Sequence, residues 1–150
     1  MVFQAKFYKG TRPGLPGVYN RLVRGWERGP YSHCELLFSD GRSWSASFMD
    51  HGVRWKFIDY DDANWDTVIL PKHMEKAALL WFLAHEGESY DLMGNLHLVI
   101  GFLPESRGKK FCSEALMASL DMDQAWRMGP NAAYETLCWR FRQEQVSTGL

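Results

Sequence analysis

The strongest constraint on the fold is a row of strand-like segments that short turns join between residues 31 and 71. These segments alternate small polar and apolar residues or are rich in aromatic and β-branched ones, which is typical of half-buried strands. They cover residues 31–38, 43–48, 53–58 and 67–71. Turn residues such as Ser39-Asp40-Gly41-Arg42 separate them. Because a parallel pair needs a crossover connection of about a dozen residues, the row predicts an antiparallel meander.

Helical patterns surround the meander and complete an α+β fold. Apolar residues recur at helical spacing in five segments: 18–26, 73–85, 92–102, one beginning at Cys112 and one beginning near Pro130. Residues 2–8 add a strand, and residues 143–150 are expected to fray. A chain of 150 residues is typical of one domain. We therefore predict a single domain over 1–150, with an antiparallel sheet of about five strands packed against helices.

Charge and patterning argue against several classes of function. The formal net charge of −1 gives no electrostatic case for a nucleic-acid partner. No run of roughly 18 apolar residues predicts a membrane span, and no signal peptide is recognisable at the start. We therefore expect a cytoplasmic protein, or a phage-encoded one in the cytoplasm of its host. The cysteines at 34, 112 and 138 are an odd, widely spaced set, typical of reduced thiols.

A cysteine at the start of a helix is the first candidate for chemistry. Cys112 lies three residues before the apolar run Ala115, Leu116 and Met117. The N-terminus of a helix offers unpaired N–H groups and partial positive charge, both of which lower the pKa of a thiol. Cys112 is therefore a candidate nucleophile, although a cysteine in an apolar helix is more often a small core residue.

The strand over residues 31–38 supplies a candidate base. Side chains alternate across a strand, so His33 and Glu35 should share one face while Cys34 and Leu36 share the other. The glutamate could then reach the imidazole ring and orient it. Cysteine-based acyl transfer needs a thiolate, an imidazole, a group that orients the imidazole and N–H donors for the oxyanion. Cys112, His33 and Glu35 can fill the first three roles.

These motifs resemble a known family. Ser32-His33 with Glu35-Leu36 on a strand, Tyr90-Asp91 after a helix and Phe111-Cys112-Ser113-Glu114 at a helix start are similar to the circularly permuted branch of the NlpC-type papain-like cysteine hydrolases. The resemblance covers roughly residues 30 to 120. It implies a permuted papain-like fold, with Cys112 as the nucleophile and His33 as the general base.

The sequence offers several candidates for the third polar residue of the site. The resemblance places it on the next strand, about a dozen residues after the histidine, which here is Ser45. Glu35 is the alternative that strand alternation favours, with His51 and Asp50 behind it. Tyr90 is a further candidate, as an oxyanion donor or a residue lining the cleft.

Other polar residues have structural explanations. Cys34 and Cys138 are expected in the core, and Glu114 is expected to complement the helix dipole and point away from Cys112. His73, His85 and His97 lie in helical segments without a zinc motif, so a zinc site is not expected there. A metal shared by His33, Cys34 and Cys112 is a less favoured alternative. No cofactor is needed for the expected chemistry.

The sequence thus predicts a cysteine peptidase or amidase that cleaves an amide or related acyl bond through a thioester acyl-enzyme. Cell-wall peptides, proteins and lipid acyl groups are all substrates within the superfamily that the motifs resemble. Two alternatives remain: a lipid or thioester acyl hydrolase or transferase on the same residues, and a non-catalytic binding domain on the same scaffold. The sequence does not indicate an oligomeric state or a biological partner.

Overall fold

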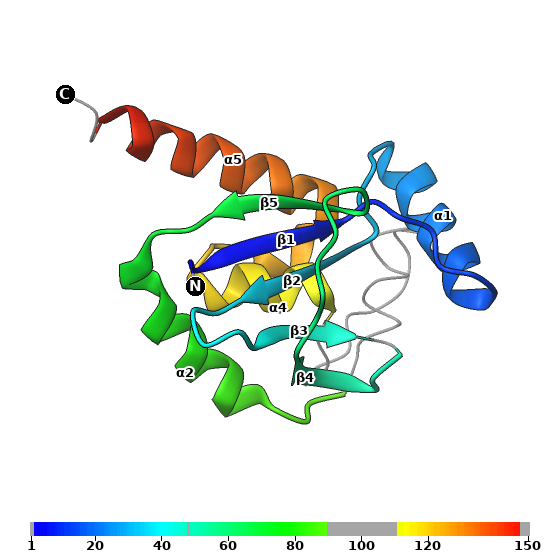
Figure 1. Ribbon diagram of the computed structural model, residues 1–150, viewed down its shortest axis with the longest axis horizontal. Coiled ribbons are helices and arrows are strands. Elements are labelled where there is room, and N and C mark those ends of the chain that lie inside the picture. The colour runs from blue at the N-terminus through cyan, green and yellow to red at the C-terminus, as the bar shows by residue number, and fades with distance from the viewer. Residues whose placement is uncertain (1, 48, 90–110, 148–150) are drawn as a thin grey trace.

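An antiparallel sheet of five strands forms the centre of the computed structural model, which describes residues 2–47, 49–89 and 111–147. The strands are β1 (Gln4–Tyr8), β2 (His33–Leu37), β3 (Ser43–Ser47), β4 (Gly52–Lys56) and β5 (Trp65–Ile69). Their order is β4-β3-β2-β1-β5 (Figure 1). The predicted antiparallel sheet is therefore confirmed, and the N-terminal strand lies inside it, between β2 and β5.

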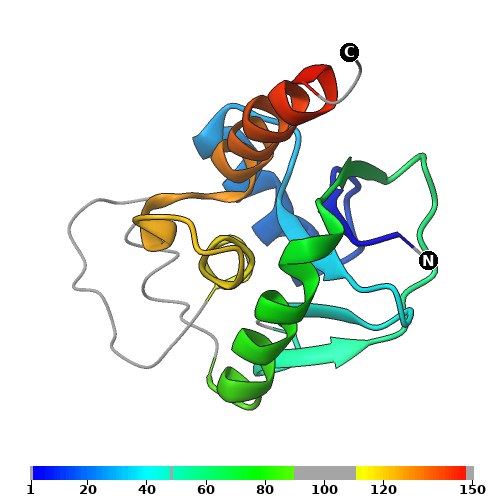
Figure 2. The same ribbon diagram turned by 90° about the vertical axis from the view of Figure 1, so that its left-hand side faces the viewer.

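Helices lie around this sheet, so the chain has the predicted α+β class. They are α1 (Leu15–Glu27), α2 (Glu75–His85), α4 (Cys112–Ser119) and α5 (Pro130–Ser147), with the short 3-10 turns η1 (Lys72–Met74) and η2 (Ala125–Arg127). Figure 2 shows α2, α4 and α5 on the same face of the sheet. The helix predicted over residues 92–102 lies outside the described residues.

The expectation of a frayed end over residues 143–150 is wrong for most of that segment. Helix α5 continues to Ser147. Gln143, Glu144 and Gln145 all have high helix propensity, so the polar composition that suggested fraying is compatible with a regular helix. Within the described part of the chain, no helix is long and apolar enough to cross a membrane.

The core lies between the sheet and α4. Strand alternation directs Cys34 and Leu36 of β2 and Trp44 of β3 to the helical side, where each is fully buried. Helix α4 is buried on nearly all sides because it packs against β2 and β3 and also contacts α2 and α5. Aromatic rings fill the remaining space, as in the pair Trp44 and Phe82, whose centroids are 5.5 Å apart.

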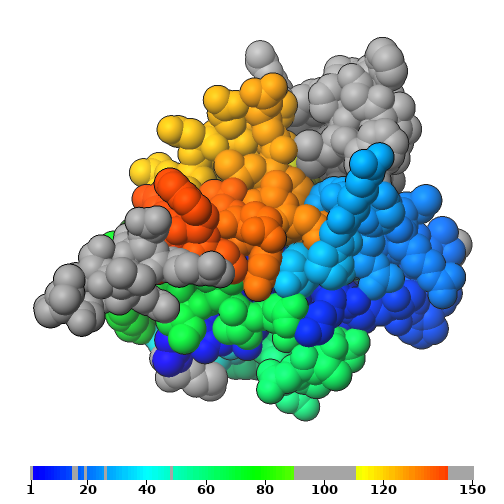
Figure 3. All heavy atoms as spheres, turned by 90° about the horizontal axis from the view of Figure 1, so that it is seen from above, coloured from blue at the N-terminus to red at the C-terminus, as the bar shows by residue number. Residues whose placement is uncertain are grey.

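The entry to β2 is anchored by residues from distant parts of the chain. Asn131, at the start of α5, accepts a hydrogen bond from the N–H of Tyr31 and donates one to its carbonyl oxygen. Asn20 of α1 donates to the hydroxyl of Ser32. Figure 3 shows the start of α5 beside the end of α1. The position of His33, which follows Ser32, is therefore set by two helices as well as by the sheet.

The opposite face of the sheet carries polar side chains under a covering segment. The connection between β4 and β5 crosses this face (Figure 1), and its Tyr60 donates a 2.7 Å hydrogen bond to the hydroxyl of Ser43. The ring of Tyr60 also contacts that of Trp65, at 4.8 Å between centroids. Polar residues of β2 and β3 on this face, including Glu35 and Ser45, are buried as well.

Candidate active site

Cys112 is the first residue of α4, as the sequence predicts. Phe111 before it is extended, with φ −109° and ψ 167°. The N–H of Ala115 makes a 2.9 Å bond to the carbonyl oxygen of Phe111, which closes the first helical turn. The N–H groups of a first turn have no acceptor within the helix, so they add partial positive charge beside the sulfur of Cys112. The residue is 2% exposed.

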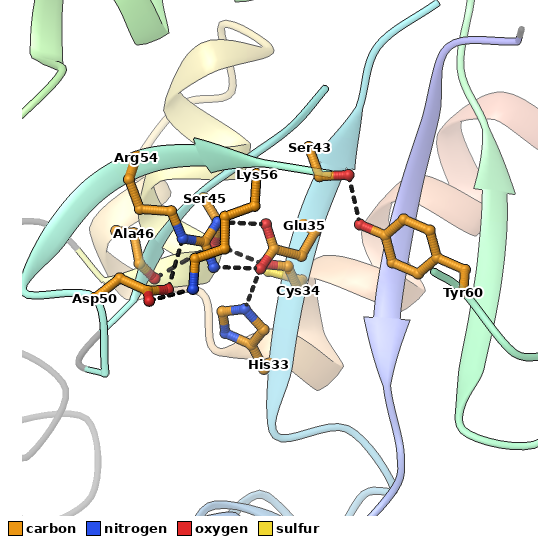
Figure 4. A network of polar contacts seen from close by, with 10 residues as sticks. All are labelled: His33, Cys34, Glu35, Ser43, Ser45, Ala46, Asp50, Arg54, Lys56 and Tyr60. Carbon is orange, nitrogen blue, oxygen red and sulfur yellow. Dashed lines mark hydrogen bonds and ion pairs between the residues drawn. The ribbon is translucent and has the colours of Figure 1, made fainter. Parts of the chain in front are cut away.

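His33 and Glu35 meet on one face of β2, as strand alternation predicts. The Nε2 atom of His33 lies 2.7 Å from Oε1 of Glu35 (Figure 4). A carboxylate only accepts hydrogen bonds, so Nε2 carries the proton and Nδ1 is the ring nitrogen left for another partner. The imidazole side chain is 16% exposed, whereas that of Glu35 is 1% exposed.

The structure brings Cys112 to His33 from about half the chain length away. Burial by itself would lower the pKa of His33, but interactions with the Cys112 sulfur and the Glu35 carboxylate raise it to about 9. The pKa of Cys112 is lowered well below its usual value; a hydrogen bond from the Cys34 side chain is the largest cause, burial opposes it and His33 adds to it. This pair of shifts favours a thiolate beside an imidazolium.

Cys34 is fully buried, as predicted, but its role is wider than core packing. It faces the helical side of the sheet, where it meets the start of α4, and its thiol interacts with Cys112. Burial and the neighbouring Cys112 sulfur raise the pKa of Cys34 well above its usual value. Cys34 therefore remains a thiol and can donate a hydrogen bond to the Cys112 thiolate.

Arg54 is a residue of this site that sequence reasoning missed. Its Nη1 and Nη2 atoms donate hydrogen bonds of 2.8 and 2.7 Å to the two oxygens of Glu35. Its Nε donates a 2.7 Å bond to Asp50, which Lys56 also contacts (Figure 4). Burial would raise the pKa of Glu35, but Arg54 and His33 lower it to about 2. The sequence feature that could have indicated this residue is a single arginine between the apolar residues Val53 and Trp55 of a predicted strand.

The other candidates for the third polar residue lie elsewhere. The hydroxyl of Ser45 donates a 2.7 Å hydrogen bond to the carbonyl oxygen of Cys34, so its first partner is the main chain of β2. His51 is exposed in the turn between β3 and β4, with a positive φ of 65°. Tyr90 lies outside the described residues. The side chain in contact with the His33 ring on the Nε2 side is that of Glu35.

Glu27, at the end of α1, is a second residue that the sequence did not indicate. Burial raises its pKa, hydrogen bonds from Asn131 lower it, and the negative charge of Cys112 raises it further. Asn131 donates to Oε2 of Glu27 through both its backbone and side-chain nitrogens, at 2.9 and 2.6 Å. Gly129 gives this carboxyl its space, because a Cβ atom there would lie 1.7 Å from Oε1.

Most of the other residues with predicted structural roles lie in helical segments of the structure. Cys138 is half-buried and packs against the core, so it is less enclosed than expected. Glu114 lies in the first turn of α4 and is 7% exposed. His85 binds the carbonyl oxygen of Trp81 through Nδ1 at 2.7 Å, and His73 lies in η1, whereas His97 is outside the described residues. Among the residues that the structure describes, no group of three or more His, Cys, Asp or Glu side chains could hold a metal.

Comparison of this chain with protein-family models, with curated proteins and with solved structures finds no match.

Proposed function

We propose that this protein is a cysteine hydrolase of the peptidase or amidase type, built on a permuted papain-like scaffold of the NlpC type. The observation that carries the proposal is the interaction of Cys112, at the start of α4, with His33, whose Nε2 atom lies 2.7 Å from the carboxylate of Glu35. A nucleophile, a base and a group that orients the base are thereby linked in one chain of contacts. A thiol needed only for packing would not require an imidazole with an ionised carboxylate behind it.

The reaction follows from the resting charge state. The Cys112 thiolate attacks the carbonyl carbon of an amide, and the carbonyl oxygen becomes an oxyanion. The backbone N–H of Cys112, at the helix terminus, can donate a hydrogen bond to this oxyanion. The Nδ1–H of the His33 imidazolium then protonates the departing amine, which leaves a thioester on Cys112. The neutral imidazole takes a proton from water, and the resulting hydroxide attacks the thioester. Collapse releases the acid and returns the thiolate and imidazolium.

Glu35 holds the ring in the orientation that this sequence requires. Because its carboxylate accepts from Nε2–H, the proton that moves during the reaction is the one on Nδ1. The same carboxylate stabilises the imidazolium electrostatically in a site where little water can screen the interaction. Cys34 also supports the thiolate, through a hydrogen bond from its own thiol.

A panel of electrophiles tests the proposal and separates the substrate classes. The protein is treated near pH 6 with peptidyl, simple amide, ester and long-chain acyl probes, and the modified sulfur is located by mass spectrometry. We expect adducts on Cys112 that form faster than on a free model thiol, with peptidyl and amide probes favoured. Preference for long-chain acyl probes would instead indicate a lipid or thioester acyl hydrolase.

The Cys112→Ala protein is the matched control, because it retains Cys34 and Cys138. Slow labelling of Cys112 with the pH dependence of an ordinary thiol would contradict the proposal. That result would favour a non-catalytic binding domain.

A further inference from the structure

The ion pair between Arg54 and Glu35 is unusually enclosed for a pair of charges. The Glu35 side chain is 1% exposed and that of Arg54 is 16% exposed. Removing two charges from water is costly, and their attraction offsets this cost only when the geometry is good and the remaining hydrogen bonds are satisfied. A buried pair is therefore weak evidence for stability. Such a pair is better explained by the geometry that it fixes.

The hydrogen bonds of Glu35 hold its carboxylate in one orientation. Oε1 accepts from Nε2 of His33 and from Nη2 of Arg54, both at 2.7 Å, and Oε2 accepts from Nη1 of Arg54 at 2.8 Å. Two parallel bonds to a planar guanidinium restrict rotation of the carboxylate far more than one bond could. The Oε1 atom that faces His33 is therefore held in place from behind.

Arg54 reaches Glu35 across an intervening strand. Arg54 is on β4 and Glu35 on β2, which lie about 10 Å apart because β3 runs between them. Ser45 of β3 is paired with Arg54 in the register of the sheet. Its short side chain bonds to the carbonyl oxygen of Cys34, so the arginine can pass over β3. Asp50 holds Nε of Arg54 from the other end, as Figure 4 shows.

We propose that Arg54 is a positioning residue of this site: it fixes Oε1 of Glu35 on Nε2–H of His33, so that Nδ1 is presented to Cys112. The inference rests on the proposed function, because it concerns the same three residues. Arg54 touches none of the reacting atoms and acts through Glu35. Without the guanidinium, the buried carboxylate would rotate or take up a proton, and the imidazole would lose both its orientation and its stabilising charge.

The first experiment measures labelling of Cys112 by iodoacetamide between pH 4 and 9, with peptide mass spectrometry to separate Cys112 from Cys34 and Cys138. We expect Arg54→Met to shift the midpoint of the profile upward by about one pH unit or more, which lowers the rate about tenfold or more at pH values below the original midpoint. Arg54→Lys keeps the charge but not the paired geometry, so we expect it to recover only part of the rate. Circular dichroism checks that each variant is folded.

Arg42→Met is the matched control. Arg42 pairs with Asp40 at the surface and also lies over the Trp55 ring, so its loss removes an arginine ion pair in the turn between β2 and β3. We expect its labelling profile to match that of the unmodified protein. An equal shift in Arg42→Met and Arg54→Met would mean that general loss of an arginine, rather than the position of Arg54, causes the effect, and would overturn the inference.

A second measurement separates this inference from the proposed function. The 15N NMR shifts of His33 are recorded in the Cys112→Ala protein, which cannot react, with and without Arg54→Lys. A protonated Nε2 that loses its strong hydrogen bond in Arg54→Lys supports the positioning role even if no hydrolase activity is found. Unchanged shifts in folded Arg54→Lys together with an unchanged labelling profile would overturn it, even if Cys112 proves to be the nucleophile.

Discussion

The imidazole of His33 and the carboxylate of Glu35 are two residues apart on β2 and meet with 2.7 Å between Nε2 and Oε1. Residues at this spacing share one face of a strand, so a single strand supplies both the imidazole and the carboxylate that contacts it. This contact is local in the sequence. The interaction of the same imidazole with Cys112 depends on the packing of α4 against β2. Four predictions follow from this arrangement and its surroundings.

Replacing each of the two buried cysteines in turn should identify the nucleophile. Cys112→Ala should abolish any hydrolase activity and remove the thiol that reacts near pH 6. Cys34→Ala should leave Cys112 as the labelled residue but slow its labelling at pH 6 several-fold, because the Cys34 side chain helps to lower the pKa of Cys112. Peptide mass spectrometry after a short exposure to iodoacetamide measures both effects. Rapid labelling of residue 34 in the Cys112→Ala protein would reverse the assignment.

Removing the imidazole should make Cys112 behave like a more ordinary thiol. In His33→Ala the thiolate loses both a hydrogen-bond donor and a positive charge, so the pKa of Cys112 should rise. We expect labelling at pH 6 to slow by about tenfold or more, since only the thiolate reacts. The measurement is the rate against pH, with His73→Ala as the control because His73 lies in η1. Similar profiles for both variants would contradict the pairing of His33 with Cys112.

Glu35 should make folding stability depend on pH in the acid range. Its pKa is about 2 in the folded protein against a usual value of 4.5. Because the folded-state pKa is the lower one, the stabilisation is complete above pH 4.5 and is lost as the pH falls from 4.5 toward 2. A shift of this size corresponds to about 3 kcal/mol, of which about 2 kcal/mol should be lost by pH 3.

Urea unfolding at pH 6 and pH 3 checks this prediction. The free energy of unfolding should fall less between the two pH values in Glu35→Gln than in the unmodified protein. Asp40→Asn, which removes a surface partner of Arg42, serves as the control and should change the pH dependence little. An identical acid dependence in Glu35→Gln and the unmodified protein would contradict the strongly lowered pKa of Glu35.

Ser45 and Glu35 can be distinguished as orienting residues. The hydroxyl of Ser45 is bonded to the main chain of Cys34, so Ser45→Ala should cost about 1 kcal/mol of stability, the usual value of such a bond. The pH profile of Cys112 labelling should stay within about twofold of the original, since the alanine leaves the path of Arg54 open. A loss of thiolate character as large as that of His33→Ala would return the orienting role to Ser45.

Local rules of chain geometry determined much of this protein from its sequence. Short turns between strand-like segments required antiparallel pairing, strand alternation placed His33 and Glu35 together, and the helix boundary placed Cys112 at a terminus. Each of these depends on residues close in sequence. The tertiary structure decided the contacts of Cys34 with Cys112, of Arg54 with Glu35 across β3, and of Glu27 with its neighbours near the sulfur. These contacts depend on the lateral order of the strands and on how α1 and α4 pack against the sheet. Both are set by packing between distant segments, which produces no periodic pattern in the sequence.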